Sequence, residues 1–408
     1  MNEVSKSRKG QRIVAALDVG SSKTACLIVE VGEPQVSTIA SCLDNARVLG
    51  VGYQRSQGVK GGVVFDPRAV ETSIRGAVDK AERQAGHSVD QLFISVNTGR
   101  IRSQNYGASL ELGGSRVKPS HIDALYREGW DHIAHSPEAI LHSLPLGFAL
   151  DGASGIESPV GYSGRHLFAD FHVVSASLGD VRRLLDCIED SFLSPVSVVA
   201  SPYASALATM RQRESNEGVA VLDLGGGTSS LAVFANDRFI YAGSLAKGGI
   251  QISAALARKF AMTWSDAEHL KLQIGTYAGG SVSYPKVNEL IARQLTGIFL
   301  HQKKKMQDSG FAFDAVRYIV LTGGGARYYD AARIAAQVFG KPVRIGVPRA
   351  VSGMPPQLVN PAFATLWGVI AYQGARHREL AGRFAGLTGT GGKGSLSRLG
   401  SWFQQLTV

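Results

Sequence analysis

The chain has 408 residues, of which 44% are hydrophobic and 19% charged, a composition typical of folded proteins with two or three domains. No stretch offers the roughly 20 consecutive apolar residues of a membrane-spanning helix, and residues 1–11 lack the apolar run of a signal peptide. The three cysteines, Cys26, Cys42 and Cys187, lie far apart and are expected to be reduced thiols of a cytosolic protein. Composition therefore excludes secreted, membrane-spanning and disulfide-stabilised proteins.

The net charge of +10 is concentrated at the two ends of the chain. Residues 1–12 carry a net charge of +3 and residues 371–408 carry +4. Basic segments of this kind suit an anionic membrane surface, whereas a nucleic-acid interface would need a basic stripe interleaved with aromatic residues. Because the body of the chain lacks such a stripe, we expect no nucleic-acid partner.

Two segments share the pattern of a strand, a turn rich in glycine and serine, and a second strand. The first covers Arg12–Val31, with Asp18 near the end of its leading strand, and the second covers Val219–Phe234, with Asp223 at the same place. The two aspartates are 205 residues apart. Internal similarity at this period predicts two related lobes, each of which opens with a β-hairpin.

Hydrophobic periodicity and start and stop signals predict the other elements. Further strands are predicted over Leu92–Val96, Phe168–Val174 and Tyr318–Leu321. Strand-to-helix or helical segments are predicted over Pro195–Ser205 and Pro361–Tyr372. Helices are predicted over Asp66–Ala85, Ser120–Ala134 with Ser120 as its N-cap, Gly249–Phe260, Ser265–Ile274, Val287–Gln307 and Tyr329–Phe339.

Glycine-rich turns present consecutive backbone N–H groups with no side chain in the way, and such turns bind phosphate oxygens. Two of them facing each other would hold a triphosphate from both sides, and Asp18 and Asp223 would hold a hydrated Mg²⁺ between them. Gly20–Thr24 is not a P-loop, because the upstream glycine is missing and a strand follows. Gly225–Gly227 is no dinucleotide fingerprint, because a strand follows it too. The alternative is that each segment is only a tight β-turn.

A third glycine cluster, Thr322–Ala326, follows another strand. The three glycine segments together resemble the two phosphate hairpins and the adenosine loop of the actin, sugar-kinase and heat-shock chaperone ATPases. Within that superfamily, Ile140–Ala176 is similar to subdomain 1C, which the FtsA family of bacterial actin-like cell-division proteins carries in place of an actin subdomain. The resemblance covers nearly the whole chain from about Arg12.

This resemblance implies an α/β, two-lobed actin-like ATPase fold with subdomains 1A, 1C, 2A and 2B and a C-terminal amphipathic helix. The implied ranges are 1–11 for a flexible basic tail, 12–86 and 166–210 for 1A, 87–165 for 1C, 211–248 and 311–375 for 2A, 249–310 for 2B, 376–394 for a linker and 395–408 for the amphipathic helix.

The resemblance also implies that ATP and Mg²⁺ bind in the cleft. Glu268 and Lys271, three apart on one helical face, resemble the superfamily's ribose-contacting pair, and the alternative is a solvated ion pair. The adenosine contacts would be Gly323, Gly324 and Gly325, where only glycine allows close approach. The phosphate contacts would be Gly20, Ser21, Ser22, Lys23, Gly225, Gly226, Gly227 and Thr228.

No general base is identified, so catalytic residues stay unassigned. Where many superfamily members place an acidic residue or glutamine to orient the attacking water, this chain has Ser201-Pro202. Ile250-Gln251-Ile252 also replaces polar residues that are common in the FtsA family. Positioning and metal electrostatics alone support slow phosphoryl transfer to water. We therefore expect ATP binding with at most slow hydrolysis.

The predicted helix 395–408 places its apolar side chains on one face. At about 1.5 Å per residue it is too short to span a roughly 30 Å bilayer core, so we expect it to lie in the interface of an anionic membrane. The alternative is a helix docked on the protein's own core, against which the Gly/Thr-rich linker argues. The membrane-facing residues would be Leu396, Leu399, Trp402, Phe403 and Leu406.

By resemblance, the protein would polymerise on the inner face of the bacterial cytoplasmic membrane at the division septum, anchor the FtsZ ring and recruit later divisome proteins through subdomain 1C. The C-terminal tail of FtsZ would dock near Ile252–Lys305, with Lys303, Lys304 and Lys305 meeting its acidic residues. The alternative is that this lysine triplet is only a solvated helix end.

The main alternative function is a sugar or acetate kinase of the same superfamily, which needs a carboxylate base. A DNA-segregating actin is a third, for which the sequence places no recognition helix.

Overall fold

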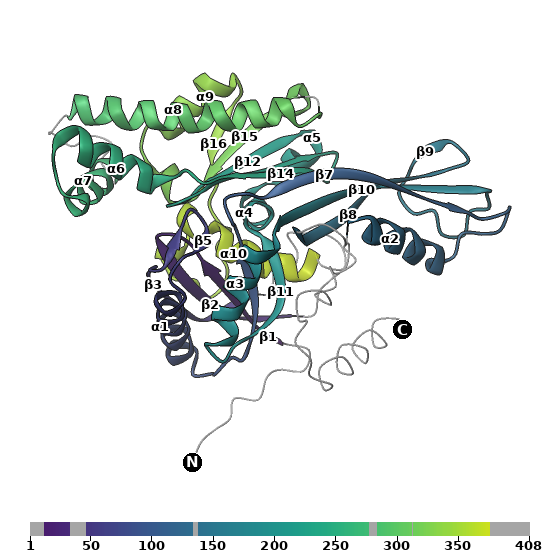
Figure 1. Ribbon diagram of the computed structural model, residues 1–408, viewed down its shortest axis with the longest axis horizontal. Coiled ribbons are helices and arrows are strands. Elements are labelled where there is room, and N and C mark those ends of the chain that lie inside the picture. The colour runs from purple at the N-terminus through teal and green to yellow at the C-terminus, as the bar shows by residue number, and fades with distance from the viewer. Residues whose placement is uncertain (1–11, 33–45, 134–137, 277–283, 312, 376–408) are drawn as a thin grey trace, which may run out of the picture.

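The computed structural model describes residues 12–32, 46–133, 138–276, 284–311 and 313–375. Two five-stranded sheets form the centres of two lobes, and a third sheet extends from them as an arm (Figure 1). The first two sheets have equivalent strand orders, β3-β2-β1-β6-β11 in the first lobe and β14-β13-β12-β15-β16 in the second. The internal repeat predicted from the two hairpins is therefore present in the sheet topology.

The first lobe is built around the hairpin predicted from Arg12–Val31. Its strands β1, β2 and β3 pair antiparallel, while β6 lies parallel to both β1 and β11. The interior residues of β1 and β2 are buried on both faces, as expected for a sheet covered by helices on both sides. The strands are β1 (Arg12–Val19), β2 (Lys23–Val31), β3 (Arg47–Arg55), β6 (Gln91–Val96) and β11 (Ser194–Ala200), and a short hairpin is formed by β4 (Val59–Lys60) and β5 (Val63–Val64).

Helix α1 (Pro67–Ala85) covers the first sheet and packs beside α3 (Leu178–Glu189). The Asp66 carboxylate accepts a hydrogen bond from the Ala69 amide over 3.2 Å, and Pro67 occupies the first helical position, as is common at helix starts. Gly86 ends the helix with φ +66°, a conformation that glycine adopts without strain. The predicted helix is confirmed, with Asp66 as its N-cap.

The second lobe repeats this arrangement. β12 (Val219–Leu224) and β13 (Ser229–Ala235) form the second predicted hairpin, and β15 (Tyr318–Thr322) lies parallel to β12 as β6 lies parallel to β1. Three helices that follow β14 pack as a block, and α9 connects β15 to β16. The other elements are α5 (Gln212–Glu217), β14 (Arg238–Leu245), α6 (Gly249–Phe260), α7 (Trp264–Thr276), α8 (Pro285–Asp308), α9 (Ala331–Phe339) and β16 (Val343–Ile345).

Two helices, α4 (Ser201–Thr209) and α10 (Ala364–Ala375), pack against each other between the two sheets (Figure 1). A Cβ on Gly368 would lie 1.7 Å from the Ala204 carbonyl oxygen, so the two backbones approach as closely as only glycine allows. α4 packs on β12 and β13, whereas α10 packs on β1 and β6. The predicted ranges assign α4 to 1A and α10 to 2A, so each helix packs on the sheet of the lobe opposite to its predicted one.

The arm is an antiparallel sheet in the order β7-β10-β8-β9, packed against α2. The Phe171 ring packs 5.2 Å from Tyr106 and 4.6 Å from Tyr126, measured between centroids. Ser120 is the second residue of α2 rather than its predicted N-cap. The elements are β7 (Arg102–Glu111), α2 (Pro119–Ile133), β8 (Glu138–Leu150), β9 (Ala153–Ile156) and β10 (His166–Ser177).

The arm does not follow the range 87–165 predicted for subdomain 1C. β6 lies inside that range but pairs with β1 and β11 of the first lobe. β10 lies outside the range but pairs with β7 and β8. Both differences arise because sheet membership depends on partners distant in the chain, which local patterning does not reveal.

Within the described ranges, no helix is long and apolar enough to cross a membrane. Cys26 and Cys187 are buried free thiols, as predicted. Cys42, the predicted tail 1–11, the linker 376–394 and the amphipathic helix 395–408 lie outside the described residues.

Candidate functional site

The turns of the two repeated hairpins have the same geometry. The Gly20 amide donates to the Lys23 carbonyl over 3.0 Å, and the Gly225 amide donates to the Thr228 carbonyl over 2.9 Å. The two donors are 205 residues apart, and so are the two acceptors. The repeat therefore extends from the order of the strands to single turn hydrogen bonds.

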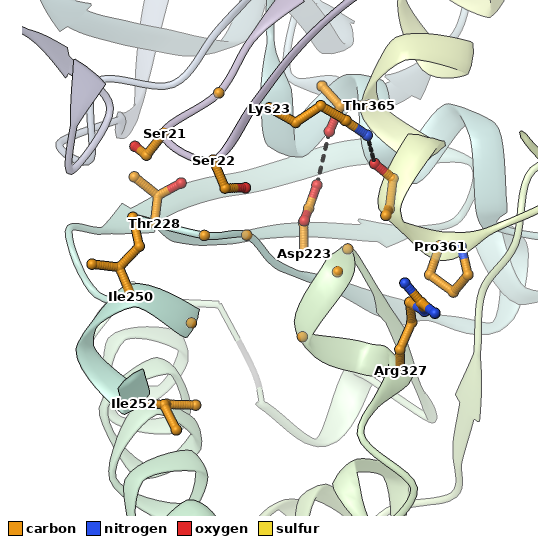
Figure 2. A pocket seen from close by; sticks show the side chains of 18 of the residues that line it. Ser21, Ser22, Lys23, Asp223, Thr228, Ile250, Ile252, Arg327, Pro361 and Thr365 are labelled. Atoms are coloured by element: carbon orange, nitrogen blue, oxygen red, sulfur yellow. Dashed lines mark hydrogen bonds between the residues drawn. The ribbon is translucent and has the colours of Figure 1, made fainter. Parts of the chain in front are cut away.

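These two turns lie against each other at the junction of the lobes (Figure 2). A Cβ on Gly226 would lie 2.6 Å from the Ser22 hydroxyl, and a Cβ on Gly227 would lie 2.4 Å from the Ser21 hydroxyl. The Ser21 hydroxyl also accepts a hydrogen bond from the Gly62 amide over 3.2 Å. The second turn therefore needs glycine, since a side chain there would displace the first turn.

Four backbone amides in the turns are left without a hydrogen bond to any described residue. They belong to Ser21, Ser22, Gly226 and Gly227. A row of unpaired amides attracts anionic oxygens, because each N–H carries a partial positive charge that needs an acceptor. The turns therefore offer a binding surface for phosphate from both lobes.

Three charged side chains, Asp18, Asp223 and Lys23, lie half-buried beneath the turns. Burial raises the pKa of Asp18 and of Asp223, and it lowers the pKa of Lys23 to about 8, although the opposite charges partly offset these shifts. The Ser95 hydroxyl donates to Asp18 over 2.5 Å, and the Thr365 hydroxyl donates to Asp223 over 2.8 Å. A further cation would stabilise both ionised carboxylates.

Lys23 also connects the first turn to the start of α10. Its ammonium group donates to the Ala362 carbonyl and lies 3.4 Å from the centroid of the Phe363 ring. Figure 2 shows Lys23 pointing toward the segment between Pro361 and Thr365. The lysine is therefore held beside the site by two contacts, one with a carbonyl and one with an aromatic ring.

The two aspartates fit a hydrated Mg²⁺. In the described part of the chain, Oδ2 of Asp18 and Oδ1 of Asp223 accept no hydrogen bond from a side chain. No group of three or more His, Cys, Asp or Glu residues there could hold a metal ion. Mg²⁺ keeps several waters and takes only one or two carboxylates, so a pair with one free oxygen each suits it.

The third glycine cluster closes the site on the side of the second lobe. Gly323 has φ +83°, and a Cβ on it would lie 2.2 Å from Oδ1 of Asp223, so this position requires glycine. A Cβ on Gly325 would lie 2.9 Å from Cβ of Leu224. A Cβ on Gly324 would come no closer than 4.0 Å to its neighbours, so Gly324 faces open space.

The Glu268–Lys271 pair lies on α7 in the wall of the same site. The Lys271 ammonium donates to Glu268 over 2.7 Å and to the Gly249 carbonyl over 2.9 Å, and the Ser253 hydroxyl donates to the same carboxylate. The side chains are 16% exposed for Lys271 and 27% for Glu268, and burial lowers the pKa of Lys271. The pair is therefore partly buried and ordered, unlike the solvated ion pair that was the alternative.

These groups line one cavity of about 260 Å³. All the residues predicted to contact phosphate, adenosine, ribose or metal border it except Gly227, which packs against Ser21. One part is polar, where the two turns meet, and Ile250 lies beside it, since its amide donates to the Gly226 carbonyl (Figure 2). The helical block lines the rest with the apolar side chains of Ile252, Leu272, Ile291 and Leu295.

Several polar residues of the site were not predicted from the sequence. The Asn97 side-chain amide donates to the Thr228 hydroxyl over 3.1 Å and joins the lobes. Asn97 follows β6, the equivalent of β15, so the repeat itself was a signal that could have located it. Ser205 and Thr365 both donate to Asp223. They come from α4 and α10, whose packing no local pattern predicts.

The predicted lysine triplet does not form one surface. The Lys303 ammonium donates to the Val338 carbonyl over 2.8 Å, and the Lys305 ammonium donates to the Ser244 carbonyl over 2.6 Å. Both therefore tie α8 to its own lobe. Lys304 has a side chain that is 78% exposed and lies 4.0 Å from the Asp308 carboxylate on the same helix, so it alone of the three is largely presented to solvent.

Comparisons with known proteins identify the family. The family model for cell division protein FtsA matches residues 220–368, and the model for the SHS2 domain inserted in FtsA matches residues 98–175. The cell division protein FtsA of Rhizobium meliloti (strain 1021) is 34% identical over 421 residues, which cover 97% of this chain and 95% of the relative. The chain belongs to the FtsA family. The SHS2 match coincides with the FtsA arm formed by β7–β10, including the strand that the range 87–165 left out.

Solved structures of lower identity show the same fold. A chain of the PilM-PilN type IV pilus biogenesis complex aligns with a TM-score of 0.63 and 17% identity over 88% of this chain and 98% of that chain. MreB5 of Spiroplasma citri bound to ADP aligns with a TM-score of 0.50 and 11% identity over 89% of this chain and 97% of that chain. The predicted two-lobed actin-like α/β fold of this chain is confirmed, while its C-terminal helix stays a prediction.

Proposed function

We propose that this protein binds Mg-ATP in the cavity between its lobes. The observation that carries the proposal is the pair of equivalent glycine turns, whose unpaired amides meet beside one cavity. Backbone amides in such turns bind phosphate oxygens, and two turns from opposite lobes would grip a triphosphate from both sides. The ADP bound to MreB5, a structure of similar fold, supports this choice of ligand.

The rest of the cavity fits a nucleoside. The apolar wall formed by α6–α8 would receive the base, and the third glycine turn would pack against it at Gly324, where there is open space. The Glu268 carboxylate and the Lys271 ammonium would hydrogen-bond the ribose hydroxyls. The cavity therefore has a phosphate end and a base end, with the ion pair between them.

Hydrolysis is proposed to be slow at most. Each carboxylate in the cavity already has partners: Ser95 for Asp18, Ser205 and Thr365 for Asp223, and Ser253 and Lys271 for Glu268. The oxygens that these contacts leave free on Asp18 and Asp223 are the ones we assign to the hydrated Mg²⁺, so no carboxylate of the cavity is assigned as a general base on a water or a sugar hydroxyl, which also disfavours the kinase alternative. Mg²⁺ held through water by Asp18 and Asp223 would neutralise charge on the phosphates.

We further propose that this protein polymerises on the inner face of the cytoplasmic membrane at the division septum, anchors FtsZ and recruits later divisome proteins through its arm. Its membership of a cell-division family supports this role. One short amphipathic helix gives only a reversible anchor, whereas many helices on one polymer bind together by avidity. Membrane attachment and self-assembly should therefore be coupled.

The FtsZ tail is proposed to dock on the helical block α6–α8. Lys304 is the one member of the lysine triplet whose side chain is largely exposed, so it is the residue we assign to contact an acidic peptide. Lys303 and Lys305 would support that surface indirectly, because their ammonium groups hold α8 in place.

Co-sedimentation with anionic vesicles in the presence of Mg-ATP tests the membrane role. We expect the full chain to pellet and a chain ending at Lys393 to stay in solution, because the truncation removes residues 394–408. Trp402→Glu in the full chain should also abolish pelleting, since it places a charge on the apolar face of the predicted helix. If the truncated chain pellets as well as the full chain, the anchor is not at the C-terminus.

A further inference from the structure

A cation–π contact joins the two lobes beside the cavity. The guanidinium carbon of Arg55 lies 5.3 Å from the centroid of the Trp264 ring, within the distance at which an aromatic face attracts a cation. Arg55 is the last residue of β3 in the first lobe, and Trp264 is the first residue of α7 in the second. The contact therefore spans from a strand of one lobe to the helical block of the other.

Arg55 is tied to the first glycine turn. In the β2–β3 register it stands opposite Lys23, the residue that ends that turn. The next residue, Ser56, donates its amide to the Ser22 carbonyl over 3.1 Å. A displacement of Arg55 therefore acts directly on the turn that offers its amides to phosphate.

Trp264 is tied to the other half of the site. Thr263 caps α7, since its hydroxyl accepts from the Asp266 amide over 3.1 Å, which fixes Trp264 in the first turn of the helix. Glu268, four residues further along α7, lies on the same helical face. The Glu268–Lys271 pair in turn bonds the Gly249 carbonyl at the start of α6.

The start of α6 completes the chain of contacts to the second glycine turn. The Gly249 amide donates to the Gly225 carbonyl over 3.0 Å, and the Ile250 amide donates to the Gly226 carbonyl over 2.7 Å. The Arg55–Trp264 contact thus bridges two rigid groups of residues, one built on the first turn and one on the second.

Neither side chain has a competing role among the described residues. Arg55 makes no ion pair or side-chain hydrogen bond there, and Trp264 keeps 39% of its surface exposed. Neither residue borders the cavity, so neither would touch a ligand in it. Their effect on a ligand would act through the position of the lobes.

We propose that Arg55 and Trp264 form a clasp that holds the lobes together and slows the release of nucleotide. The clasp rests on the proposed nucleotide binding in the cavity, and both residues are positioning residues rather than ligand contacts. A cation–π contact at a partly exposed site accounts for about a two- to fivefold change in a rate constant. Loss of either partner should therefore speed release by that factor.

Stopped-flow release of N-methylanthraniloyl-ATP from the full chain, chased with excess Mg-ATP, tests the clasp. Arg55→Gln and Trp264→Leu should each raise the dissociation rate constant about two- to fivefold. The double variant should be no faster than the faster single variant, because the two changes remove the same contact. Arg55→Lys, which keeps a cation, should stay nearer to the parent rate than Arg55→Gln.

Two control variants separate the clasp from general surface effects. Arg47→Gln alters the other end of β3, where Arg47 pairs with Glu30 over 3.2 Å, and Phe192→Leu alters an aromatic side chain that is 88% exposed. Both should release nucleotide at the parent rate.

Unchanged release in Arg55→Gln and Trp264→Leu, or fully additive effects in the double variant, would overturn the clasp while nucleotide binding itself stands. A parent chain that binds no nucleotide would overturn the proposed function and the clasp with it.

Discussion

Two adjacent glycines in the third turn, Gly323 and Gly324, differ in how much room a side chain would have. Gly323 has a left-handed backbone and leaves no room for a Cβ beside Asp223, whereas Gly324 has open space on the side of the cavity. Gly323 is therefore needed for the fold, and Gly324 leaves room for a ligand in the cavity. The sequence alone does not distinguish these two roles.

Gly323→Ala should lower the free energy of unfolding by about 2 kcal/mol or more, since it combines backbone strain with overpacking. Gly324→Ala should change stability by less than about 1 kcal/mol and should weaken ATP binding, because its methyl group would occupy the adenosine side of the cavity. Urea unfolding followed by circular dichroism measures the first effect, and calorimetric titration with ATP measures the second. Equal losses of stability in both variants would contradict this division of roles.

His172, one of two buried histidines of the arm, should make stability depend on pH. Burial, with His142 nearby, lowers the pKa of His172 from 6.5 to about 3, and its ring bonds the Ser103 hydroxyl. Below pH 6.5 the His172 side chain binds a proton in the unfolded chain but not in the folded chain, so the free energy of unfolding falls as the pH falls toward 3. One such group lowers the free energy of unfolding by about 1.4 kcal/mol per pH unit in that window.

Replacing this histidine should flatten the acid side of the stability curve. His172→Gln should lose less stability than the parent between pH 7.5 and pH 5, by roughly 2 kcal/mol, as measured by urea unfolding at both pH values. His87→Gln, at an exposed position after α1, is the matched control and should leave the slope unchanged. A parent-like slope in His172→Gln would show that His172 is not the group responsible.

At the scale of elements, the central helix pair depends on one glycine. Gly368→Ala should lower the free energy of unfolding by about 2–3 kcal/mol, because its Cβ would lie 1.7 Å from the Ala204 carbonyl oxygen and force α4 and α10 apart. Gly297→Ala in α8 is the control, since a Cβ there meets nothing within 4 Å. That variant should gain about 0.5–1 kcal/mol from higher helix propensity, and the opposite ranking of the two variants would refute the packing argument.

Elements that carry their own signals were predicted from the sequence. Strand–glycine turn–strand patterns predict both hairpins. Helix α1 is predicted by Asp66 before Pro67 and by Gly86 after its end. These signals are local, so no partner is needed to read them. The same holds for the glycines of the site, which lie in turns that follow strands, and for its two aspartates, which lie near the ends of the leading strands β1 and β12.

Elements defined by distant partners were not predicted correctly. β6 and β10 were recognised as strands, but their sheets were exchanged with respect to the range 87–165. Ser205 and Thr365 reach Asp223 only because α4 and α10 pack between the sheets. Pairing and packing between separate elements leave no trace in local periodicity, so these parts of the site needed the structure.

At the scale of the whole molecule, function rests on a repeated lobe. The same strand order and the same turn hydrogen bond occur twice, and the repeat brings two aspartates and two sets of unpaired amides to one cavity. Each lobe alone would offer only one of these two equivalent turns, which is a weak phosphate site. The two turns together would form one site, and its affinity for nucleotide would depend on how the two lobes are positioned. The proposed Arg55–Trp264 clasp would act on that same positioning.

The most direct test of this account is calorimetric titration of the full chain with ATP in the presence and absence of Mg²⁺. The parent should bind Mg-ATP, and Asp223→Ala should abolish that binding, because the half-buried carboxylate between the two turns is lost. Asp237→Ala, in the exposed turn between β13 and β14, is the control and should bind as the parent does. Unchanged affinity for Mg-ATP in Asp223→Ala would contradict the assignment of the paired turns as the nucleotide site.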